Sequence, residues 1–241
     1  MTKNRIVVAL DVPSSEQAIN LVKKIKNDVA MVKIGLEGFV GHGPDFVRAI
    51  VSEGVDVFLD LKLHDIPRTV EAAVKQAVQL GVRFISVHAS GGRAMVRAAA
   101  EAALSYSKNQ NKTHILAVTL LTSMSASDLL DLKYPGDVAT AVRTWGHLAL
   151  EAGAEGLVLS AHELELMRDL PGLRVVPGVR LEHISNASSM KINNDDQARV
   201  ATPEWAVREG ADFLVMGRPI LQAPDPHSFL RQLNQDISDI S

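Results

Sequence analysis

The sequence predicts an α/β protein whose single domain, residues 1–241, is a (β/α)8 TIM barrel. Eight short apolar runs rich in β-forming residues each lead into a segment with helical periodicity. The length of 241 residues suits one such barrel, and no linker or low-complexity segment divides the chain. A doubly wound open sheet is the competing fold, but no G-x-G-x-x-G follows the first apolar run.

Each predicted strand is a run of mostly Val, Ile, Leu and Phe that ends in a turn or at charged residues. The first run closes at Val12-Pro13-Ser14-Ser15, a turn followed by a helix N-cap, and the second closes at Gly35. The predicted strands cover residues 6–11, 31–34, 57–63, 84–87, 114–119, 156–159, 174–176 and 213–216.

Each predicted helix carries apolar residues at helical spacing between turn signals. Two helical pieces follow the fifth strand, and a polar stretch at 182–197 precedes the helix before the last strand. The predicted helices cover residues 16–25, 44–53, 69–80, 92–105, 126–132, 138–152, 163–169, 203–209 and 226–236.

The composition is that of an ordinary water-soluble protein and excludes several functional classes. A net charge of −3 does not favour nucleic acid or an anionic membrane as a partner. The absence of cysteine excludes disulfides, thiolate metal ligands and thiol catalysis. No apolar run approaches the ~18 residues of a membrane span, and the N-terminus lacks a signal-like apolar region, so we expect a cytoplasmic protein.

The run at 57–63 carries charge on one face of a strand. Because strand side chains alternate, Asp60 and Lys62 point into the barrel, while the leucines at 59, 61 and 63 point toward the helices. Charged groups are costly there unless they are paired, and barrels place their chemistry at the carboxyl ends of strands. An isolated pair of this kind would favour a structural ion pair over a functional site. The residues of the neighbouring strands are therefore needed to choose between the two interpretations.

The ends of the first three strands together predict a network of four charges, alternately acidic and basic. Asp11 ends the first strand and Lys33 lies in the second, on the inward face near the rim that Asp60 and Lys62 occupy. A salt bridge that closes the top of the barrel is the structural alternative. Because desolvation offsets much of the Coulombic gain of such a network, function is the better explanation.

The last two strands end in residues suited to a phosphate group. Gly217 lets the backbone approach an anion, and Arg218 can bind phosphate with two hydrogen bonds. Arg180 follows the seventh strand and adds a second guanidinium. Barrels commonly hold phosphate at this position, so a phosphorylated substrate is expected.

Other polar residues at strand ends are open to two interpretations. His88 fits a residue that fixes the loop through a hydrogen bond as well as a catalyst. His64 lies in the central motif without regular metal-ligand spacing around it, so no metal site is predicted. Thr122 and Ser123 suit contacts to a polar ligand or the start of the next helix.

Read in order, the motifs resemble the orotidine 5′-phosphate decarboxylase family along nearly the whole chain. The D-x-K-x-x-D-I-P motif at 60–67 is specific when the flanking elements accompany it. The matching segments are A-L-D at 9–11, V-K-I-G at 32–35, L-D-L-K-L-H-D-I-P at 59–67, V-H-A at 87–89, V-T at 118–119, L-T-S at 121–123, P-G-V-R at 177–180, D-Q at 196–197, A-T-P at 201–203 and G-R at 217–218.

The resemblance implies decarboxylation of orotidine 5′-phosphate to UMP without a metal or organic cofactor. Lys62 resembles the acid that protonates C6 of the pyrimidine as carbon dioxide leaves. Asp60 resembles the carboxylate set against the substrate carboxylate. Lys33 resembles the residue that links Asp60 to the ribose, and Asp11 the acceptor for a ribose hydroxyl.

The resemblance also implies a homodimer with a shared site. Asp65, Ile66 and Thr69 match the segment that the family donates across the interface. Thr122 and Ser123 match the positions at which the family contacts the pyrimidine. The family's phosphate-binding residues and closing loop are matched by Arg180, Gln197, Gly217 and Arg218. The segment at 181–196, which belongs to the closing loop that carries Gln197, is longer than expected for bacterial members of the family.

Two rival functions remain at the level of sequence. A metal-dependent sugar-phosphate decarboxylase of the same superfamily would carry an acidic ligand at the position of Lys33, where a lysine repels a divalent cation. A catalytically dead barrel that senses a phosphometabolite would bind without turnover. The intact Asp60/Lys62 pair argues against such a sensor.

Overall fold

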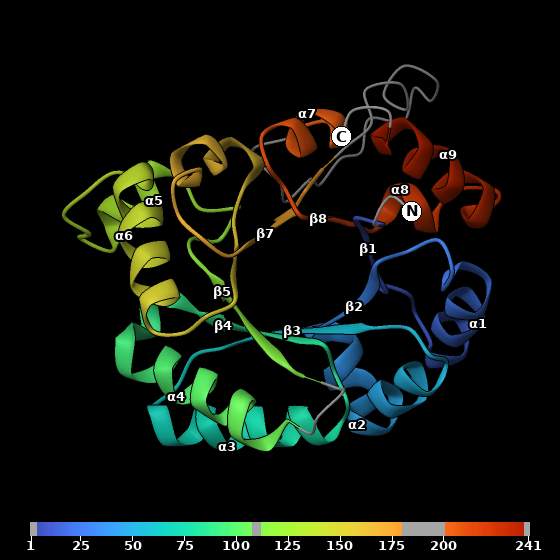
Figure 1. Ribbon diagram of the computed structural model, residues 1–241, viewed down its shortest axis with the longest axis horizontal. Coiled ribbons are helices and arrows are strands. Elements are labelled where there is room, and N and C mark those ends of the chain that lie inside the picture. The colour runs from blue at the N-terminus through green and yellow to red at the C-terminus, as the bar shows by residue number, and fades with distance from the viewer. Residues whose placement is uncertain (1–3, 108–111, 180–200, 239–241) are drawn as a thin grey trace.

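A computed structural model describes residues 4–107, 112–179 and 201–238. Eight parallel strands form a closed barrel in the order of the sequence, β1 to β8, with helices arranged around it (Figure 1). The predicted TIM barrel is confirmed. The strands are β1 Ile6–Ala9, β2 Met31–Gly35, β3 Val57–Leu63, β4 Phe84–His88, β5 His114–Val118, β6 Gly156–Val158, β7 Leu173–Pro177 and β8 Phe213–Met216.

The helices follow the strands and start at residues suited to that role. The side chains of Ser14, Asp137 and Thr202 each accept a hydrogen bond from a backbone N–H in the first turn of the helix that follows. The helices are α1 Ser15–Ile25, α2 Leu36–Ser52, α3 Pro67–Gln79, α4 Gly92–Tyr106, α5 Ala126–Asp131, α6 Val138–Glu151, α7 Pro203–Arg208, α8 Arg218–Leu221 and α9 Pro226–Ser238, with short 3₁₀ turns η1 Ala89–Gly91, η2 Ala161–Glu163 and η3 Glu165–Met167.

Two predicted helices differ from the structure. Helix α2 begins directly after β2, because a first helical piece precedes the break at Gly43 (φ 68°), and the predicted segment is only the second piece. The prediction of one helix over 163–169 was wrong, since that region forms η2 and η3. There the Arg174 guanidinium binds the carbonyl oxygens of Met167, Arg168 and Leu170, at 2.7 to 3.2 Å.

The apolar core has two layers, as alternation along the strands predicts. The interior layer includes Val7, Phe58 and Phe84, and the outer layer between strands and helices includes Val8 and Leu59. Fully burying one such side chain contributes roughly 1.5–3 kcal/mol. Phe58 and Leu59 are adjacent in sequence yet belong to different layers, so the side chain at position 60 returns to the inside of the barrel.

Strand β3 is irregular next to β4, at the residues that carry charge. Leu59 pairs with Ile85, but Leu63 pairs with Val87, so the register shifts between them. Within this shift Lys62 has φ 51°, a left-handed conformation that is uncommon for a side chain of this size. Among the described residues, no helix is long and apolar enough to cross a membrane.

Candidate active site

The predicted charges of β2 and β3 meet in one ion-pair network centred on Asp60. Oδ2 of Asp60 lies 2.7 Å from Nζ of Lys62 and 3.6 Å from Nζ of Lys33. Oδ1 accepts a 2.8 Å hydrogen bond from the hydroxyl of Ser86 on β4. The carboxylate is buried, with 7% of the residue exposed, so one anion is held between two ammonium groups.

The surroundings of Asp60 favour its charged form. Burial raises the pKa of the carboxyl, but the charges of Lys33 and Lys62 and the hydrogen bonds from Lys62 and Ser86 lower it by more. The net effect places the pKa below its ordinary value of 3.8. Asp60 is therefore an anion throughout the neutral range, and it keeps two cations beside it.

Ser86 is a member of this network that the sequence analysis missed. It is fully buried and its hydroxyl oxygen accepts a 2.8 Å hydrogen bond from the backbone N–H of Lys62. A left-handed residue other than glycine costs about 1–2 kcal/mol, which neighbouring contacts must offset. The signal was present, because Ser86 shares the parity of the inward-facing Phe84, but a lone serine in an apolar strand carries little information.

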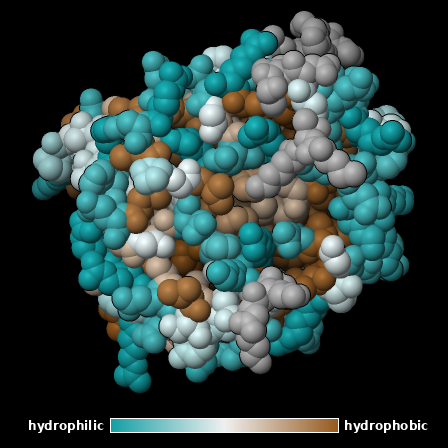
Figure 2. Space-filling view, in the orientation of Figure 1, coloured by the Kyte–Doolittle hydropathy of each residue, from teal (hydrophilic) through white to brown (hydrophobic). Residues whose placement is uncertain are grey.

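Asp11 lies at the same rim, between the ends of β2 and β8. A Cβ added to Gly217 would lie 3.6 Å from Oδ2 of Asp11. One added to Gly35 would lie 3.9 Å from Oδ1 of Asp11 and 3.2 Å from Nζ of Lys33. The two glycines thus leave room beside an exposed carboxylate and an ammonium group, a setting suited to a polyhydroxylated ligand. Seen from the side of Figure 1, the molecule has apolar residues near the centre of its surface and hydrophilic ones around them (Figure 2).

The segment after β3 turns outward from its own barrel. Asp65, Ile66 and Thr69 are exposed, with 65% of Ile66 accessible. Oδ1 of Asp65 accepts a 2.6 Å hydrogen bond from the N–H of Ile66. Within the described parts of the chain, Asp65 forms no ion pair with Lys62. The structure of one chain therefore does not bring Asp65 into the charge network.

The two histidines of the rim pack against each other. The rings of His64 and His88 lie 5.4 Å apart and tilted by 39°. Burial lowers the pKa of His88, and His64 and Lys62 lower it further, while Asp60 acts in the opposite direction. A pKa below the ordinary 6.5 leaves the His88 imidazole neutral at pH 7.

The remaining predicted site residues fall in three places. Thr122 is half-buried and Ser123 is exposed, both in the loop between β5 and α5. Arg218 is exposed at the first position of α8, directly after Gly217. Arg180, Gln197 and the segment at 181–196 lie outside the described residues.

With this geometry in place, comparison with known proteins identifies the family. The family model described as "Orotidine 5′-phosphate decarboxylase / HUMPS family" matches residues 4–233. The chain belongs to this family. The resemblance drawn from the motifs is thereby confirmed, and with it the expectation of a decarboxylase of pyrimidine nucleotide biosynthesis.

Relatives match the chain from end to end. An orotidine 5′-phosphate decarboxylase of Tolumonas auensis is 42% identical over 241 residues, which is 99% of this chain and 100% of the relative. One from Nitrosomonas europaea is 41% identical and covers 100% of both chains. The crystal structure of the Lactobacillus acidophilus enzyme superposes with a TM-score of 0.83 at 31% identity, covering 97% of this chain and 99% of that one.

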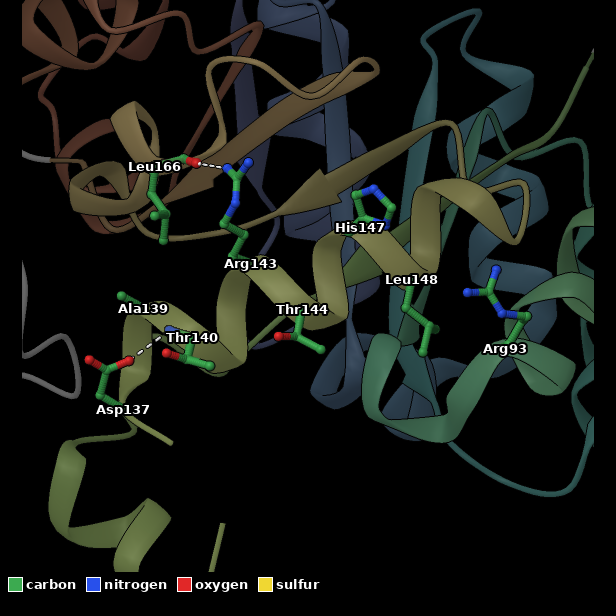
Figure 3. A pocket seen from close by; sticks show the side chains of 9 residues that line it. All are labelled: Arg93, Asp137, Ala139, Thr140, Arg143, Thr144, His147, Leu148 and Leu166. Atoms are coloured by element: carbon green, nitrogen blue, oxygen red, sulfur yellow. Dashed lines mark hydrogen bonds between the residues drawn. The ribbon is translucent and has the colours of Figure 1, made fainter. Parts of the chain in front are cut away.

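An open groove of ≈ 620 Å³ lies on a different part of the protein, along α6 (Figure 3). None of the predicted site residues lines it. Its two arginines are already paired, Arg143 with Asp169 at 2.7 Å and Arg93 with Glu151 at 2.7 Å. The groove therefore offers little to a phosphorylated substrate, and the rim around Asp60 remains the candidate site.

Proposed function

We propose that this family member decarboxylates orotidine 5′-phosphate to UMP with Lys62 as the proton donor to C6 and without a metal or organic cofactor. The observation that carries the proposal is the buried Asp60 carboxylate with Nζ of Lys62 at 2.7 Å and Nζ of Lys33 at 3.6 Å. Full-length similarity to orotidine 5′-phosphate decarboxylases supports the choice of substrate.

The chemistry requires a preorganised cation. When the bond between C6 and the carboxylate breaks, carbon dioxide leaves and the electron pair stays on C6. An sp² ring carbon stabilises that pair poorly. The Lys62 ammonium stabilises the developing charge and donates one proton to C6, which completes UMP. Solvent then returns a proton to the Lys62 amine.

Asp60 sets the direction in which charge moves during the reaction. Its carboxylate is fixed by Ser86 and Lys62, and we place the substrate carboxylate next to it. As that carboxylate becomes neutral carbon dioxide, negative charge moves away from Asp60 and toward Nζ of Lys62. The site is therefore better matched to the transition state than to the bound substrate.

The rest of the rim would hold the nucleotide away from the reacting carbon. Asp11 and Lys33 flank the space left by Gly35 and Gly217 and suit the ribose hydroxyls. Arg218 follows Gly217 directly and suits the phosphate, with Arg180 and Gln197 proposed as its further contacts. Thr122 and Ser123 are proposed to contact the pyrimidine. Binding energy from the phosphate then serves to orient C6 against Lys62.

A chelator separates this proposal from the metal-dependent rival. Lys33 occupies β2 beside the site, and the described residues contain no group of three or more His, Asp or Glu side chains arranged to hold a metal. We expect turnover of orotidine 5′-phosphate, followed by pyrimidine absorbance, to be unchanged by excess chelator. Chelator-sensitive turnover, or activity on a sugar phosphate alone, would support the rival. Binding without turnover would support a sensor.

We also propose that the active site is shared by two subunits, with Asp65, Ile66 and Thr69 donated to the partner. The support is their exposure directly after Lys62, together with the attachment of Asp65 to its own backbone rather than to Lys62. An exposed isoleucine at the rim suits burial against a second copy of the chain.

Mixed dimers test the shared site. We expect Lys62→Ala and Asp65→Asn to be inactive as homodimers. In a mixed dimer, one site combines intact Lys62 from one chain with intact Asp65 from the other. A statistical 1:1 mixture makes half of the dimers mixed, each with one good site of two, so about a quarter of wild-type activity returns. No recovery after co-expression and verified mixing would show that the site lies within one chain.

A further inference from the structure

The hydroxyl of Ser86 joins the two parts of the charge network that the reaction would use. It donates to Oδ1 of Asp60 at 2.8 Å and accepts from the backbone N–H of Lys62 at 2.8 Å. Ser86 is fully buried, so water does not replace either bond. One small side chain on β4 thus contacts both the side chain of Asp60 and the main chain of Lys62 on β3.

The irregularity of β3 explains why these bonds are needed. The register between β3 and β4 shifts between Leu59 and Leu63, and Lys62 adopts φ 51° there. The N–H of Lys62 points to a side-chain oxygen on β4 instead of a ladder carbonyl. The left-handed conformation sets the direction in which the Lys62 side chain leaves the backbone. The hydrogen bond to Ser86 holds the backbone in that conformation.

The bonding at Asp60 divides between its two oxygens. Both ammonium groups, from Lys33 and Lys62, approach Oδ2, whereas the hydroxyl of Ser86 binds Oδ1. The ion pairs alone leave the carboxylate free to rotate about its terminal torsion. The Ser86 bond supplies the second point that fixes the plane of the carboxylate, and with it the position of Nζ of Lys62.

We propose that Ser86 is a positioning residue for the proton transfer from Lys62. Its hydroxyl holds the Lys62 backbone and the Asp60 carboxylate in the relative arrangement that aims the ammonium group before substrate binds. This inference rests on the proposed role of Lys62. It adds a residue of β4 that touches neither the substrate nor the reacting atoms in the proposed mechanism.

The test compares Ser86→Ala and Ser86→Cys with a matched control. Alanine removes both hydrogen bonds, and cysteine keeps the shape of the side chain but donates and accepts weakly. Thr113→Val is the control. It removes another buried hydroxyl, which donates to the carbonyl of Val82 at 2.7 Å just before β5, at the end of that strand away from the rim.

We expect kcat to fall about tenfold to a hundredfold in Ser86→Ala, because a small misplacement of a reacting group has effects of this size. Cysteine should give an intermediate value, and KM should change by less than about threefold, since the binding groups remain. Thr113→Val should keep wild-type kcat, although its melting temperature should fall by about as much as that of Ser86→Ala.

The pH profile supplies a reading that a merely structural role would not change. The charged or titratable groups that face Asp60 are Lys33 from β2, Lys62 from β3 and His88 from the end of β4, and the Ser86 variants keep all three. The Ser86 hydrogen bond lowers the pKa of Asp60. Its loss should therefore move the acid limb of kcat to higher pH.

Wild-type kcat and an unmoved acid limb in folded Ser86→Ala would overturn the proposal. If the alanine variant does not fold, the same result in Ser86→Cys would overturn it, as would an equal fall of kcat in Thr113→Val. The role of Lys62 is judged separately. If Lys62→Ala keeps substantial turnover, the proton donor is wrong. If Lys62→Ala is inactive while Ser86→Ala matches wild type, only the positioning role fails.

Discussion

Lys62→Ala should lower kcat by about 10⁴-fold or more while the protein stays folded. The side chain is proposed to supply both a proton, for which general acid catalysis contributes about 10²–10⁴, and a preorganised cation, whose removal costs about 10²–10³. Because both effects belong to the transition state, the loss should appear in kcat with little change in KM. Steady-state kinetics with orotidine 5′-phosphate would measure it.

Arg218→Ala is the matched control for this result. Its guanidinium is exposed after β8 and is proposed to hold the phosphate in substrate and transition state alike, so its loss should raise KM. Folding of Lys62→Ala is expected because Lys33 still pairs with Asp60, and circular dichroism would verify it. A Lys62→Ala variant that kept more than about a hundredth of wild-type kcat would contradict the role of proton donor.

Asp60→Asn should produce the second largest loss, about 10³-fold in kcat. The neutral amide removes a carboxylate that lies within 4 Å of both Lys33 and Lys62, so the two ammonium groups repel each other and Nζ of Lys62 moves away from position 60. The loss of hydrogen bonds to a charged group should also lower the free energy of unfolding by about 1.5–3 kcal/mol.

The pH dependence of stability checks that this loss arises from the charge of Asp60. Because its pKa lies below the ordinary 3.8 in the folded protein, its charge stabilises the fold above that pH. The contribution disappears as pH falls through the lowered pKa. Denaturant unfolding of wild type and Asp60→Asn should therefore differ at pH 7 and converge in strong acid. An equal difference at both pH values would contradict this assignment.

The sequence was sufficient for the barrel and for the residues whose positions follow from strand parity. Asp60, Lys62 and Lys33 could be predicted because inward-facing residues of adjacent parallel strands meet at one rim. The network is centred on Asp60, and Asp11 stands beside it rather than in an alternating chain of four charges. That detail depends on side-chain reach, which parity does not give.

Other features depend on contacts that a local pattern does not contain. The proposed role of Ser86 depends on the departure of Lys62 from the extended conformation. The first piece of α2 contains several glycines, which obscure a helical pattern. Arg174, from β7, binds the carbonyl oxygens of Met167 and Leu170 beside the 3₁₀ turns, and the pattern of 163–169 does not contain this contact. The assignment of Asp65 to a partner's site stays a prediction, since a single chain does not contain that contact.

The closed order of the strands divides the proposed active site by origin in the chain. The proposed reacting charges come from β2 and β3, and the hydroxyl of Ser86 that holds them comes from β4; these three strands are consecutive in sequence. The room beside Asp11, in contrast, is bounded by Gly217, so it exists only where β1 meets β8. A chain growing from its N-terminus contains all the reacting charges long before it contains the last strand. In the proposed mechanism, nucleotide binding therefore waits for a contact between β1 and β8, and a copy of the chain without β8 would hold the reacting groups without a place for the substrate.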